Sequence, residues 1–326
     1  MDKQSLRIVF LGTPEFAVES LEAIIADGYN VVGVVTMPDK PAGRGHKMYQ
    51  SPVKLCALSH AIPVLQPVKL KDPEFISQLR DLRADLFIVI AFRMLPEVVW
   101  TMPPLGTFNL HASLLPRYRG AAPINRAVMN GDTETGVTTF FLRHDIDTGD
   151  IIDRERVDIL PTDNVGDVHD RLMHLGATLT LKTIRDIVDG TVRTTPQAEL
   201  VGDIEPTPAP KIFREDCEID WTLPAVRIHN QVRGLSPYPG AFTTLADGSA
   251  LKIFETALCD ATSAPALSPG DTAVEGDTLY IGTGSAPLRV ISLQPQGKRR
   301  MPAADWLRGL RAPVSLIVPS QSADNQ

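Results

Sequence analysis

Two polar side chains, Asn109 and His111, are separated by a single residue, Leu110, in an otherwise apolar stretch that begins at Phe108. On a β-strand alternate side chains point to opposite faces, so the amide and the imidazole would share one face while Phe108 and Leu110 pack into the core. An amide can hold a developing oxyanion, and an imidazole can move a proton near neutral pH. The pair therefore indicates chemistry at a carbonyl group, although a strand-end histidine satisfied by hydrogen bonds would give the same pattern.

The residues after this pair have the composition of a ligand-binding loop. Segment 113–116 (SLLP) leads into 117–120 (RYRG) and then into a helix that begins near Pro123. Loops that leave strand ends are where α/β proteins place their ligands. We therefore expect the functional centre to lie between Phe108 and Met129.

A second polar segment, residues 144–150 (HDIDTGD), contains three carboxylates. It does not fit an EF-hand calcium loop, because Gly149 and Arg156 stand where that loop needs other residues. We expect it to present the carboxylate of Asp147 to the face that carries His111, where it would fix the tautomer of the imidazole and order a water molecule. The alternative is an acidic turn at the surface.

The elements that would position these residues follow the pattern of a parallel α/β sheet. Apolar runs at 6–11 and 30–36 flank a helical pattern, which makes a βαβ unit. The continuous apolar run 86–91 predicts a doubly covered central strand. The turn after the first run lacks the further glycines of a dinucleotide-binding fingerprint. We also expect strands at 63–65, 108–111 and 135–142, and helices at 52–59, 72–82, 123–130 and 165–189, the last one either continuous or broken at Gly176.

One region interrupts this pattern in the first half of the chain. Residues 37–51 are rich in Pro and Gly and carry Lys40, Arg44 and Lys47. Such a composition does not continue a strand or a helix, which predicts a long, exposed, mobile loop. Positive charge on such a loop suits contact with phosphates, whereas the alternative is a solvated surface excursion.

Residues 205–211 (EPTPAPK) are Pro-rich, which predicts a linker between a first domain at 1–204 and a second at 212–318. The second domain should hold a helix at 224–233 and short strands separated by turns, a pattern typical of a small β-barrel. Those strands are expected at 241–245, 251–258, 278–281 and 288–293. Residues 298–300 (KRR) form a basic cluster or a merely solubilising turn, and 319–326 is expected to be a disordered tail.

The chain has 326 residues, 43% of them hydrophobic, and a formal net charge of −7. The length suits two domains, and the negative charge argues against a general nucleic-acid coat protein while leaving room for a local basic patch. Cys56, Cys217 and Cys259 are scattered without a C-x-x-C motif, which predicts a reduced compartment, no disulfide framework and no metal site. The first apolar run is too short for a signal sequence or a membrane span, so we expect a cytoplasmic protein without membrane contact.

Taken together, these motifs resemble the methionyl-tRNA formyltransferase family, in order and over nearly the whole chain. The matching stretches are 7–17 (RIVFLGTPEFA), 38–45 (PDKPAGRG), 51–54 (SPVK), 108–128 (FNLHASLLPRYRGAAPINRAV), 135–140 (TGVTTF), 145–152 (DIDTGDII), 219–221 (IDW) and 292–301 (SLQPQGKRRM). The resemblance implies a Rossmann-like formyltransferase domain with a mostly parallel sheet, followed by a smaller OB-like β-barrel that helps to hold tRNA. It also suggests a monomer.

The resemblance implies that the protein transfers the formyl group of 10-formyltetrahydrofolate, a co-substrate, to the amino group of methionyl initiator tRNA without a metal ion. Asn109, His111 and Asp147 match the family's catalytic residues. The segment that contacts tetrahydrofolate is matched by Ser113, Leu114, Leu115 and Pro116. Arg44 matches an arginine that family members insert at the end of the acceptor stem, and the further tRNA-binding residues that we expect are Lys47, Lys298 and Arg299.

Two departures from the family pattern lie beside the expected folate pocket. Ala112 replaces a usual glycine, and residues 91–96 (AFRMLP) are one residue shorter than the common version, with Arg93 in place of a glycine. Three alternatives stay open. A formyltransferase for an amino-sugar nucleotide or another small amine would share the catalytic residues but would not need Arg44. The others are a hydrolase of the formyl donor and a non-catalytic module that binds nucleotide and RNA.

Overall fold

The computed structural model describes residues 2–42, 47–201, 206–260, 264–310 and 313–317; the side chains of Ala42 and Lys47 are not described. The chain divides into two compact units. The N-terminal unit comprises Met1–Pro123, Glu134–Asp158 and His169–Pro210, and the C-terminal unit comprises Ile124–Thr133, Ile159–Val168 and Lys211–Gln326.

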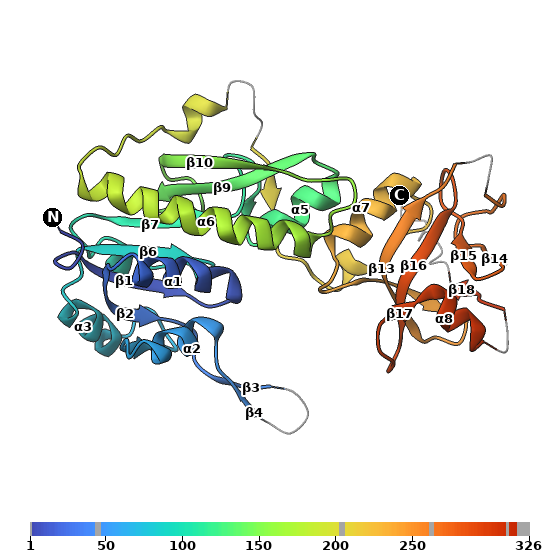
Figure 1. Cartoon of the computed structure of the whole chain (residues 1–326), viewed down its shortest axis with the longest axis horizontal. Helices are drawn as coiled ribbons and strands as arrows, with labels where there is room; N and C mark the ends of the chain where they lie inside the picture. Colours follow the sequence, from blue (N-terminus) through green and yellow to red (C-terminus); the bar gives the residue numbers. More distant parts are fainter. Residues whose placement is uncertain (1, 43–46, 202–205, 261–263, 311–312, 318–326) are drawn as a thin grey trace, which may run out of the picture. The chain divides into compact units, whose positions relative to one another are not determined.

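The N-terminal unit is built on a mostly parallel sheet of seven strands among the described residues, in the order β10-β9-β7-β6-β1-β2-β5 (Figure 1). The pairs β1–β2, β1–β6, β2–β5 and β6–β7 are parallel, and β9 runs antiparallel to both β7 and β10. The strands are β1 (Arg7–Gly12), β2 (Asn30–Val35), β5 (Val64–Leu65), β6 (Leu86–Ile90), β7 (Thr107–His111), β9 (Glu134–Phe141) and β10 (Ile151–Asp158). The predicted Rossmann-like architecture is confirmed.

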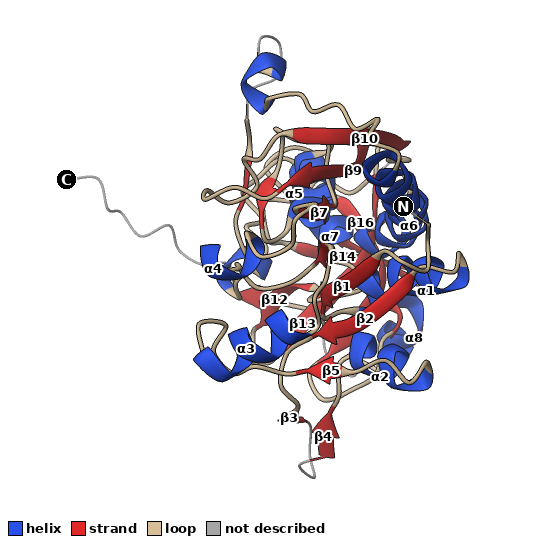
Figure 2. Ribbon diagram, turned by 90° about the vertical axis from the view of Figure 1, so that its left-hand side faces the viewer, coloured by secondary structure: helices blue, strands red, loops and turns tan. Residues whose placement is uncertain are grey.

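Helices cover both faces of this sheet (Figure 2), which is why its central strands are apolar on both sides. Val9 and Leu11 of β1 pack with Phe75, Leu79 and Val99 from the helices on one face, and α1, α2 and α6 lie on the other. The helical segments up to residue 200 are η1 (Glu15–Ala17), α1 (Val18–Ala26), α2 (Pro52–Ser59), α3 (Pro73–Asp81), α4 (Glu97–Trp100), α5 (Pro123–Asn130), α6 (Val165–Val188) and η2 (Gln197–Leu200). Of these, α5 after Pro123 and the start of α6 up to Val168 belong to the C-terminal unit.

Helix α6 runs without a break through Gly176, so the continuous form of the two that the sequence left open is the one present. The reason is close packing on β7. A Cβ atom added at Gly176 would lie 2.6 Å from Leu110 Cδ2, so a larger residue there would require the Leu110 side chain to shift.

Two short ribbons lie outside the large sheet. The prediction of an unbroken loop at 37–51 is wrong in part, because β3 (Lys40–Ala42) and β4 (Lys47–Tyr49) pair antiparallel in it. A two-stranded ribbon has two free edges, so Pro41 loses little by lacking an N–H. In the Pro-rich stretch predicted as a linker, β11 (Pro208–Ala209) pairs in parallel with β8 (Arg119–Gly120).

Strand β10 was not predicted, because no strand was expected between Asp150 and the Pro-rich stretch that begins at residue 205. Its sequence, IIDRERVD, is strongly charged, and most of its residues are half-buried or exposed. A charged strand at a sheet edge pairs on one side only and need not show a hydrophobic alternation. The antiparallel β9–β10 hairpin therefore forms the edge of the sheet.

The C-terminal unit is built from antiparallel strands. Its described strands form one sheet in the order β14-β15-β16-β13-β12-β18, with β17 paired to β16. Trp221, fully buried, lies in its core, and its indole N–H donates to Thr243 Oγ1 at 3.0 Å. The elements are η3 (Glu215–Cys217), α7 (Ala225–Gly234), β12 (Ala241–Leu245), β13 (Ala250–Leu258), β14 (Thr272–Glu275), β15 (Thr278–Ile281), β16 (Leu288–Pro295), β17 (Met301–Pro302), α8 (Ala303–Arg308) and β18 (Leu316–Ile317).

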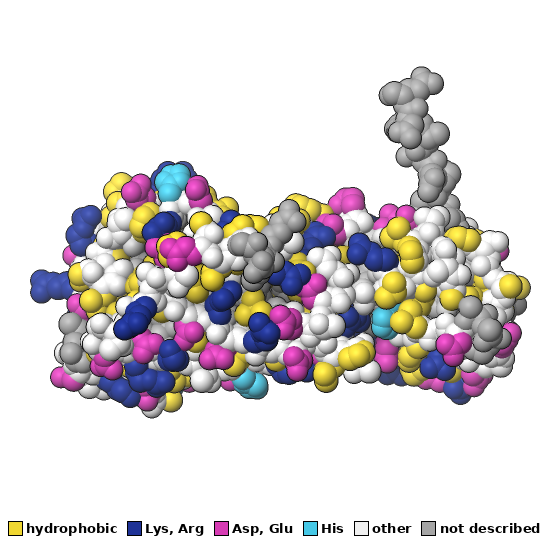
Figure 3. Space-filling model, turned by 90° about the horizontal axis from the view of Figure 1, so that it is seen from above, with side chains coloured by type: hydrophobic (Ala, Val, Ile, Leu, Met, Phe, Trp, Pro, Cys, Tyr) yellow, Lys and Arg dark blue, Asp and Glu magenta, His cyan; other side chains and the backbone are white. Residues whose placement is uncertain are grey.

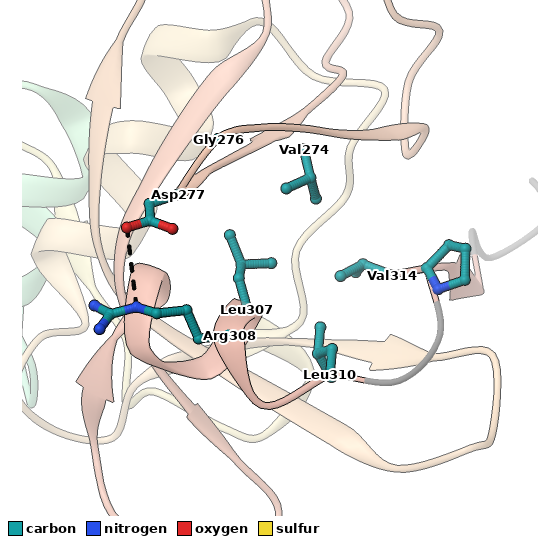
Figure 4. Close-up of a pocket in the computed structure, with 8 residues that line it drawn as sticks. Val274, Gly276, Asp277, Leu307, Arg308, Leu310 and Val314 are labelled. Atoms are coloured by element: carbon teal, nitrogen blue, oxygen red, sulfur yellow. Dashed lines mark ion pairs between the residues drawn. The ribbon is translucent and has the colours of Figure 1, made fainter.

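A cavity of about 460 Å³ opens in the C-terminal unit between β14 and the segment that follows α8 (Figure 4). Its lining is mainly aliphatic, and Arg308 Nε lies 3.9 Å from Asp277 Oδ2. The lining residues are Val274, Gly276, Asp277, Leu307, Arg308, Leu310, Pro313 and Val314. Such a lining suits apolar contact rather than group transfer.

Candidate active site

The last residues of β7 place the polar pair predicted from sequence at the carboxyl end of the parallel strands. Phe108 and Leu110 are buried, and Asn109 and His111 share the opposite face of the strand. His111 pairs with Thr138 of the antiparallel neighbour β9, while Asn109 pairs with Val89 of β6. The polar pair thus lies where the sheet changes from parallel to antiparallel.

The imidazole of His111 is held from two sides. Its Nε2 lies 2.8 Å from the backbone oxygen of Tyr118, and its Nδ1 lies 3.7 Å from Asp147 Oδ2. A carbonyl oxygen can only accept a hydrogen bond, so Nε2 donates the proton in this contact. The nitrogen that can gain or lose a proton is therefore Nδ1, which faces the carboxylate at a separation too long for a direct hydrogen bond.

Asp147 is fixed by its own loop. Its Oδ2 accepts a hydrogen bond from the Gly120 N–H at 2.9 Å, and its side chain is only 13% exposed. Its φ of +53° lies in the left-handed region, which Asp tolerates better than most residues. The structure thus brings Asp147 to His111, as the sequence analysis expected.

Asn109 supplies a polar group that the protein leaves without a partner. Its Oδ1 is buried and accepts no hydrogen bond from the described residues. Buried polar atoms are usually paired, so an unpaired one beside two titratable groups marks a position that a ligand can fill. Because an amide can turn over about its terminal bond, the same position can present the Nδ2 donor.

Tyr118, whose carbonyl oxygen accepts the hydrogen bond from His111 Nε2, has a strained backbone. Tyr118, which is buried, has a φ of +59°, a conformation that costs about 1–3 kcal/mol for a non-glycine residue. Its N–H donates to Thr207 Oγ1 at 3.1 Å, and Thr207 O accepts from the Arg119 N–H at 3.0 Å. The β8–β11 ribbon therefore keeps the Tyr118 carbonyl aimed at the imidazole.

Gln197, which was not predicted as a site residue, joins the two loops of the site. Its Nε2 donates to the backbone oxygens of Asp147 and Gly149, each at 2.9 Å. Its Oε1 accepts from Arg119 Nε at 3.0 Å and Nη2 at 2.6 Å. The side chain is 3% exposed. Gln197 lies on η2, in a segment without a motif, and its only sequence signal is a neutral amide among charged and apolar neighbours.

The predicted folate-contact segment is rigidly held by β9. Thr138 Oγ1 donates to Ser113 O at 2.6 Å and accepts from the Leu115 N–H at 3.1 Å, and Ser113 Oγ donates to Arg117 O. Ser113, Leu115 and Pro116 are buried, whereas Leu114 is half-buried. Of these four side chains, Leu114 is therefore the one most open to a ligand.

Two of the basic residues predicted to bind tRNA, Lys298 and Arg299, belong to the C-terminal unit. Arg44 is outside the described residues, and of Lys47 only the backbone, in β4, is described. Lys298 and Arg299 are exposed on the turn between β16 and β17. Their neighbour Arg300 contacts strands β13 and β16: its guanidinium lies 4.8 Å from the Phe254 ring centre, and its Nε donates to Ser292 Oγ.

Charges of both signs are mixed on the face shown in Figure 3, where Lys and Arg alternate with Asp and Glu rather than forming one large patch. Binding of a polyanion there would depend on local clusters. No helix among the described residues has the length and apolar character needed to cross a bilayer.

Arg93, one of the two departures from the family pattern, is fixed over the segment after β5. Its guanidinium donates to Pro67 O at 2.8 Å and to Val68 O at 3.1 Å. Partial burial lowers the pKa of Arg93 from its ordinary value. The Arg93 side chain thus links the loop 91–96 to the segment that contains Pro67 and Val68, and its positive charge is held by their two carbonyl oxygens.

Two family models match the chain. One, described as formyl transferase, matches residues 6–184, and the other, described as formyl transferase, C-terminal domain, matches residues 211–311. Solved structures share the fold. An N-formyltransferase from Helicobacter canadensis, in complex with folinic acid and dTDP-3-aminofucose, has a TM-score of 0.66 at 19% identity, over 91% of this chain and 100% of that chain. HypX from Aquifex aeolicus with tetrahydrofolic acid has a TM-score of 0.61 at 17% identity, over 93% of this chain and 47% of that chain.

Relatives of known name show which formyl transferase family the chain belongs to. A protein named methionyl-tRNA formyltransferase from Bacteroides fragilis is 56% identical over 314 residues, which is 95% of this chain and 96% of the relative. One of the same name from Porphyromonas gingivalis is 46% identical over 313 residues, 95% of this chain and 97% of the relative. The chain belongs to the methionyl-tRNA formyltransferase family.

Proposed function

We propose that the protein transfers the formyl group of 10-formyltetrahydrofolate to the α-amino group of methionyl initiator tRNA, giving N-formylmethionyl-tRNA for translation initiation. The name shared by close relatives such as the one from Bacteroides fragilis supports this substrate pair. The observation that carries the proposal is the approach of Asp147 to His111 at the end of β7, with 3.7 Å between the carboxylate and the imidazole, while Asn109 lies on the same face of that strand as His111. Structural neighbours crystallised with folinic acid and tetrahydrofolic acid support a folate donor.

The reaction is an acyl transfer between two nitrogens. The amine nitrogen attacks the formyl carbon, and the carbonyl electrons move to oxygen. The bond from the formyl carbon to N10 of the folate then breaks, the amine loses a proton and N10 gains one. The formyl donor is already activated, so no protein nucleophile is needed; Ser113, whose hydroxyl donates to Arg117 O, is not offered as one.

Asn109 and His111 would stabilise the oxyanion. The unpaired amide position of Asn109 can present its N–H₂ donor to the formyl oxygen. His111 holds a fixed proton on Nε2 through Tyr118, so the donor that it can aim at the oxyanion is Nδ1–H of the imidazolium form. Both donors come from one face of β7 and, once the Asn109 amide presents Nδ2, both can face the developing charge.

Asp147 would stabilise the imidazolium and accept the amine proton through a water molecule. Its Oδ2 lies 3.7 Å from Nδ1 and is already bound by the Gly120 N–H, which leaves Oδ1 for other donors. A carboxylate in this position can compensate the positive charge of an imidazolium that forms during the reaction. It can also order a water between itself and the amine.

The folate and tRNA contacts are further parts of the proposal. The backbone of segment 113–116 and the half-buried Leu114 would contact tetrahydrofolate, and Arg44, Lys47, Lys298 and Arg299 would contact tRNA phosphates. We also propose that the protein acts as a monomer.

The test is a formylation assay with purified protein and 10-formyltetrahydrofolate. We expect the formyl group to be transferred to methionyl initiator tRNA and much more slowly to elongator methionyl-tRNA. An amino-sugar nucleotide should not be formylated. Preferential formylation of that nucleotide, release of free formate without an acceptor, or binding without turnover would each reject the proposal in favour of one of its rivals.

A further inference from the structure

A cluster of three potential metal ligands lies on the helices α1 and α2, in the N-terminal unit and outside the site described above. Glu22 comes from α1, Cys56 from α2, and His60 from the residue that ends α2. Cys56 and His60 are four residues apart, so they lie one above the other on the same helix face. The two helices pack against each other, which brings Glu22 to this face from 34 residues away.

The three side chains already contact one another. The Cys56 thiol donates to Glu22 Oε1 at 3.1 Å, and His60 Nε2 lies 2.9 Å from Glu22 Oε2. One potential ligand atom from each of the three residues can be chosen so that all lie within 4.8 Å of one another. Cys56 is 7% exposed, whereas the side chains of His60 and Glu22 are 36% and 45% exposed. The cluster therefore has a buried sulfur and an open side through which an ion can enter.

These separations are near the ligand spacing around a tetrahedral zinc ion. With metal–ligand distances of about 2.0–2.3 Å, neighbouring ligands in a tetrahedron are about 3.3–3.6 Å apart. Cys56 and His60 contact different oxygens of Glu22, so the carboxylate would have to turn one oxygen toward the ion, and ligand atoms that now lie within 4.8 Å of one another would move to this spacing. Glu22 and His60 are partly exposed, so their side chains have room for this adjustment.

We propose that Glu22, Cys56 and His60 form a binding site for a Zn²⁺-class ion, with water in the fourth position. One thiolate, one imidazole and one carboxylate are the donor types that zinc takes in proteins. The thiolate disfavours Mg²⁺ and Ca²⁺, which prefer oxygen. This site takes no part in the formyl transfer proposed above, so either proposal can fail without the other.

The competing account is a hydrogen-bonded triad that never binds metal. Burial, with the hydrogen bond to Glu22 and the nearby carboxylate charge, raises the pKa of the Cys56 thiol to about 12. Without an ion the thiol is therefore protonated, and metal uptake must release that proton. The two accounts differ in one respect that can be measured, namely whether a metal–sulfur bond forms.

A bound ion would join α1 to α2 through side chains alone. Helix α2 begins at Pro52, directly after Ser51, whose hydroxyl contacts Thr36 Oγ1 at 2.7 Å at the end of β2. A link between the two helices would stabilise the folded state because the unfolded chain does not hold the three ligands together. We therefore expect zinc to raise the melting temperature of the full chain.

The experiment is a titration of the reduced full-length protein with Co²⁺ in the absence of oxygen. We expect one ion per chain and a near-ultraviolet absorption band from charge transfer between thiolate and cobalt, which Zn²⁺ then abolishes by displacement. Cys56→Ser should remove the band. His60→Gln and Glu22→Gln should weaken binding by more than about tenfold, since even partners that only orient a ligand contribute that much.

Two matched variants control for nonspecific effects. Cys259→Ser removes a half-buried thiol outside the cluster, and His174→Gln removes a histidine that pairs with Glu19 without a thiol; both should bind cobalt as the parent does. His60 is exposed, so its variant should fold even if Cys56→Ser does not. Absence of a charge-transfer band at saturating cobalt, or equal affinity in the parent and His60→Gln, would overturn the proposal.

Discussion

The residues proposed for chemistry in the N-terminal unit and those proposed for tRNA binding in the C-terminal unit differ in burial. In the N-terminal unit, His111, Gln197 and Ser113 are nearly or fully buried, and each makes hydrogen bonds that fix its direction. In the C-terminal unit, Lys298 and Arg299 stand exposed on a turn. Group transfer needs atoms held in place, whereas attraction of phosphates acts over a longer range and tolerates mobile side chains.

This contrast separates the effects expected on turnover from those expected on tRNA binding. Changes in the N-terminal site should lower kcat, because they disturb interactions formed in the transition state. Changes on the C-terminal turn should raise KM for tRNA and depend on salt. The following variants test this division.

The largest effect is expected from the oxyanion donors. Asn109→Ala and His111→Ala should each lower kcat by about 10²–10³-fold, since that is the usual result of removing one such donor. Binding of methionyl initiator tRNA, measured by filter binding without the formyl donor, should stay close to that of the parent. Turnover near the parent value in either variant would exclude that residue from the chemistry.

A smaller loss should follow when the link between the two catalytic loops is changed. Gln197→Glu replaces the N–H₂ that donates to the Asp147 and Gly149 carbonyls with an acceptor. We expect kcat to fall by about 10–100-fold through displacement of Asp147, with a shifted pH profile and little change in KM.

Gln231 provides the matched control for this variant. Its Nε2 also donates to two carbonyl oxygens, those of Asp216 and Glu218, but in the C-terminal unit. Gln231→Glu should lower the melting temperature without lowering kcat. If both glutamine variants lose turnover equally, Gln197 has only a general structural role.

The basic turn should affect tRNA use alone. Lys298→Ala with Arg299→Ala should raise KM for tRNA severalfold at low salt and leave kcat unchanged. Each lost phosphate contact should reduce the slope of log affinity against log salt by about 0.7–0.9, so the defect shrinks as salt rises. Arg308→Ala, which removes a partner of Asp305, is the control for a cation in the same unit. A salt slope equal to that of the parent would show that the turn is a solubilising feature.

The smallest effect concerns stability. Burial, with the charge of Arg233 as a smaller cause, lowers the pKa of His229 from its ordinary value of 6.5. The folded state therefore favours the neutral imidazole, and the unfolded state binds more protons as the pH falls below 6.5. The free energy of unfolding should decrease over that range and level off below the folded-state pKa. In His229→Gln, urea unfolding at several pH values should show a smaller decrease; an unchanged pH dependence would contradict this assignment.

Much of the fold could be predicted because it depends on local patterns. Helices α2 and α5 and strands β12 and β15 have the predicted bounds. Their ends are marked by residues with local effects, such as the Ser51 cap of α2 and Gly131, with a φ of +78°, after α5. The formyl transferase fold is confirmed. The ribbon β3–β4 and the edge strand β10 escaped prediction because short or charged strands carry no periodic signal.

In the candidate site, too, features that depend on local sequence could be predicted and those that depend on distant residues could not. Alternation along β7 was enough to place Asn109 and His111 on one face, since that geometry is local. The role of Gln197 was not predictable, because it bonds to a loop 50 residues earlier in the chain. The Glu22, Cys56 and His60 cluster was missed for the same reason, as the cysteines alone indicated no metal site. The catalytic roles of Asn109 and His111, the role of Gln197 and metal binding by the cluster stay predictions until the variants are measured.

The most direct measurement is the single-turnover rate of formyl transfer in Asp147→Asn. The amide is nearly isosteric and keeps an oxygen for the Gly120 N–H, but it removes the negative charge 3.7 Å from His111 Nδ1. With saturating donor and methionyl initiator tRNA, we predict a rate at least about 100-fold below that of the parent, with unchanged affinity for tRNA. A rate within twofold of the parent would contradict the account.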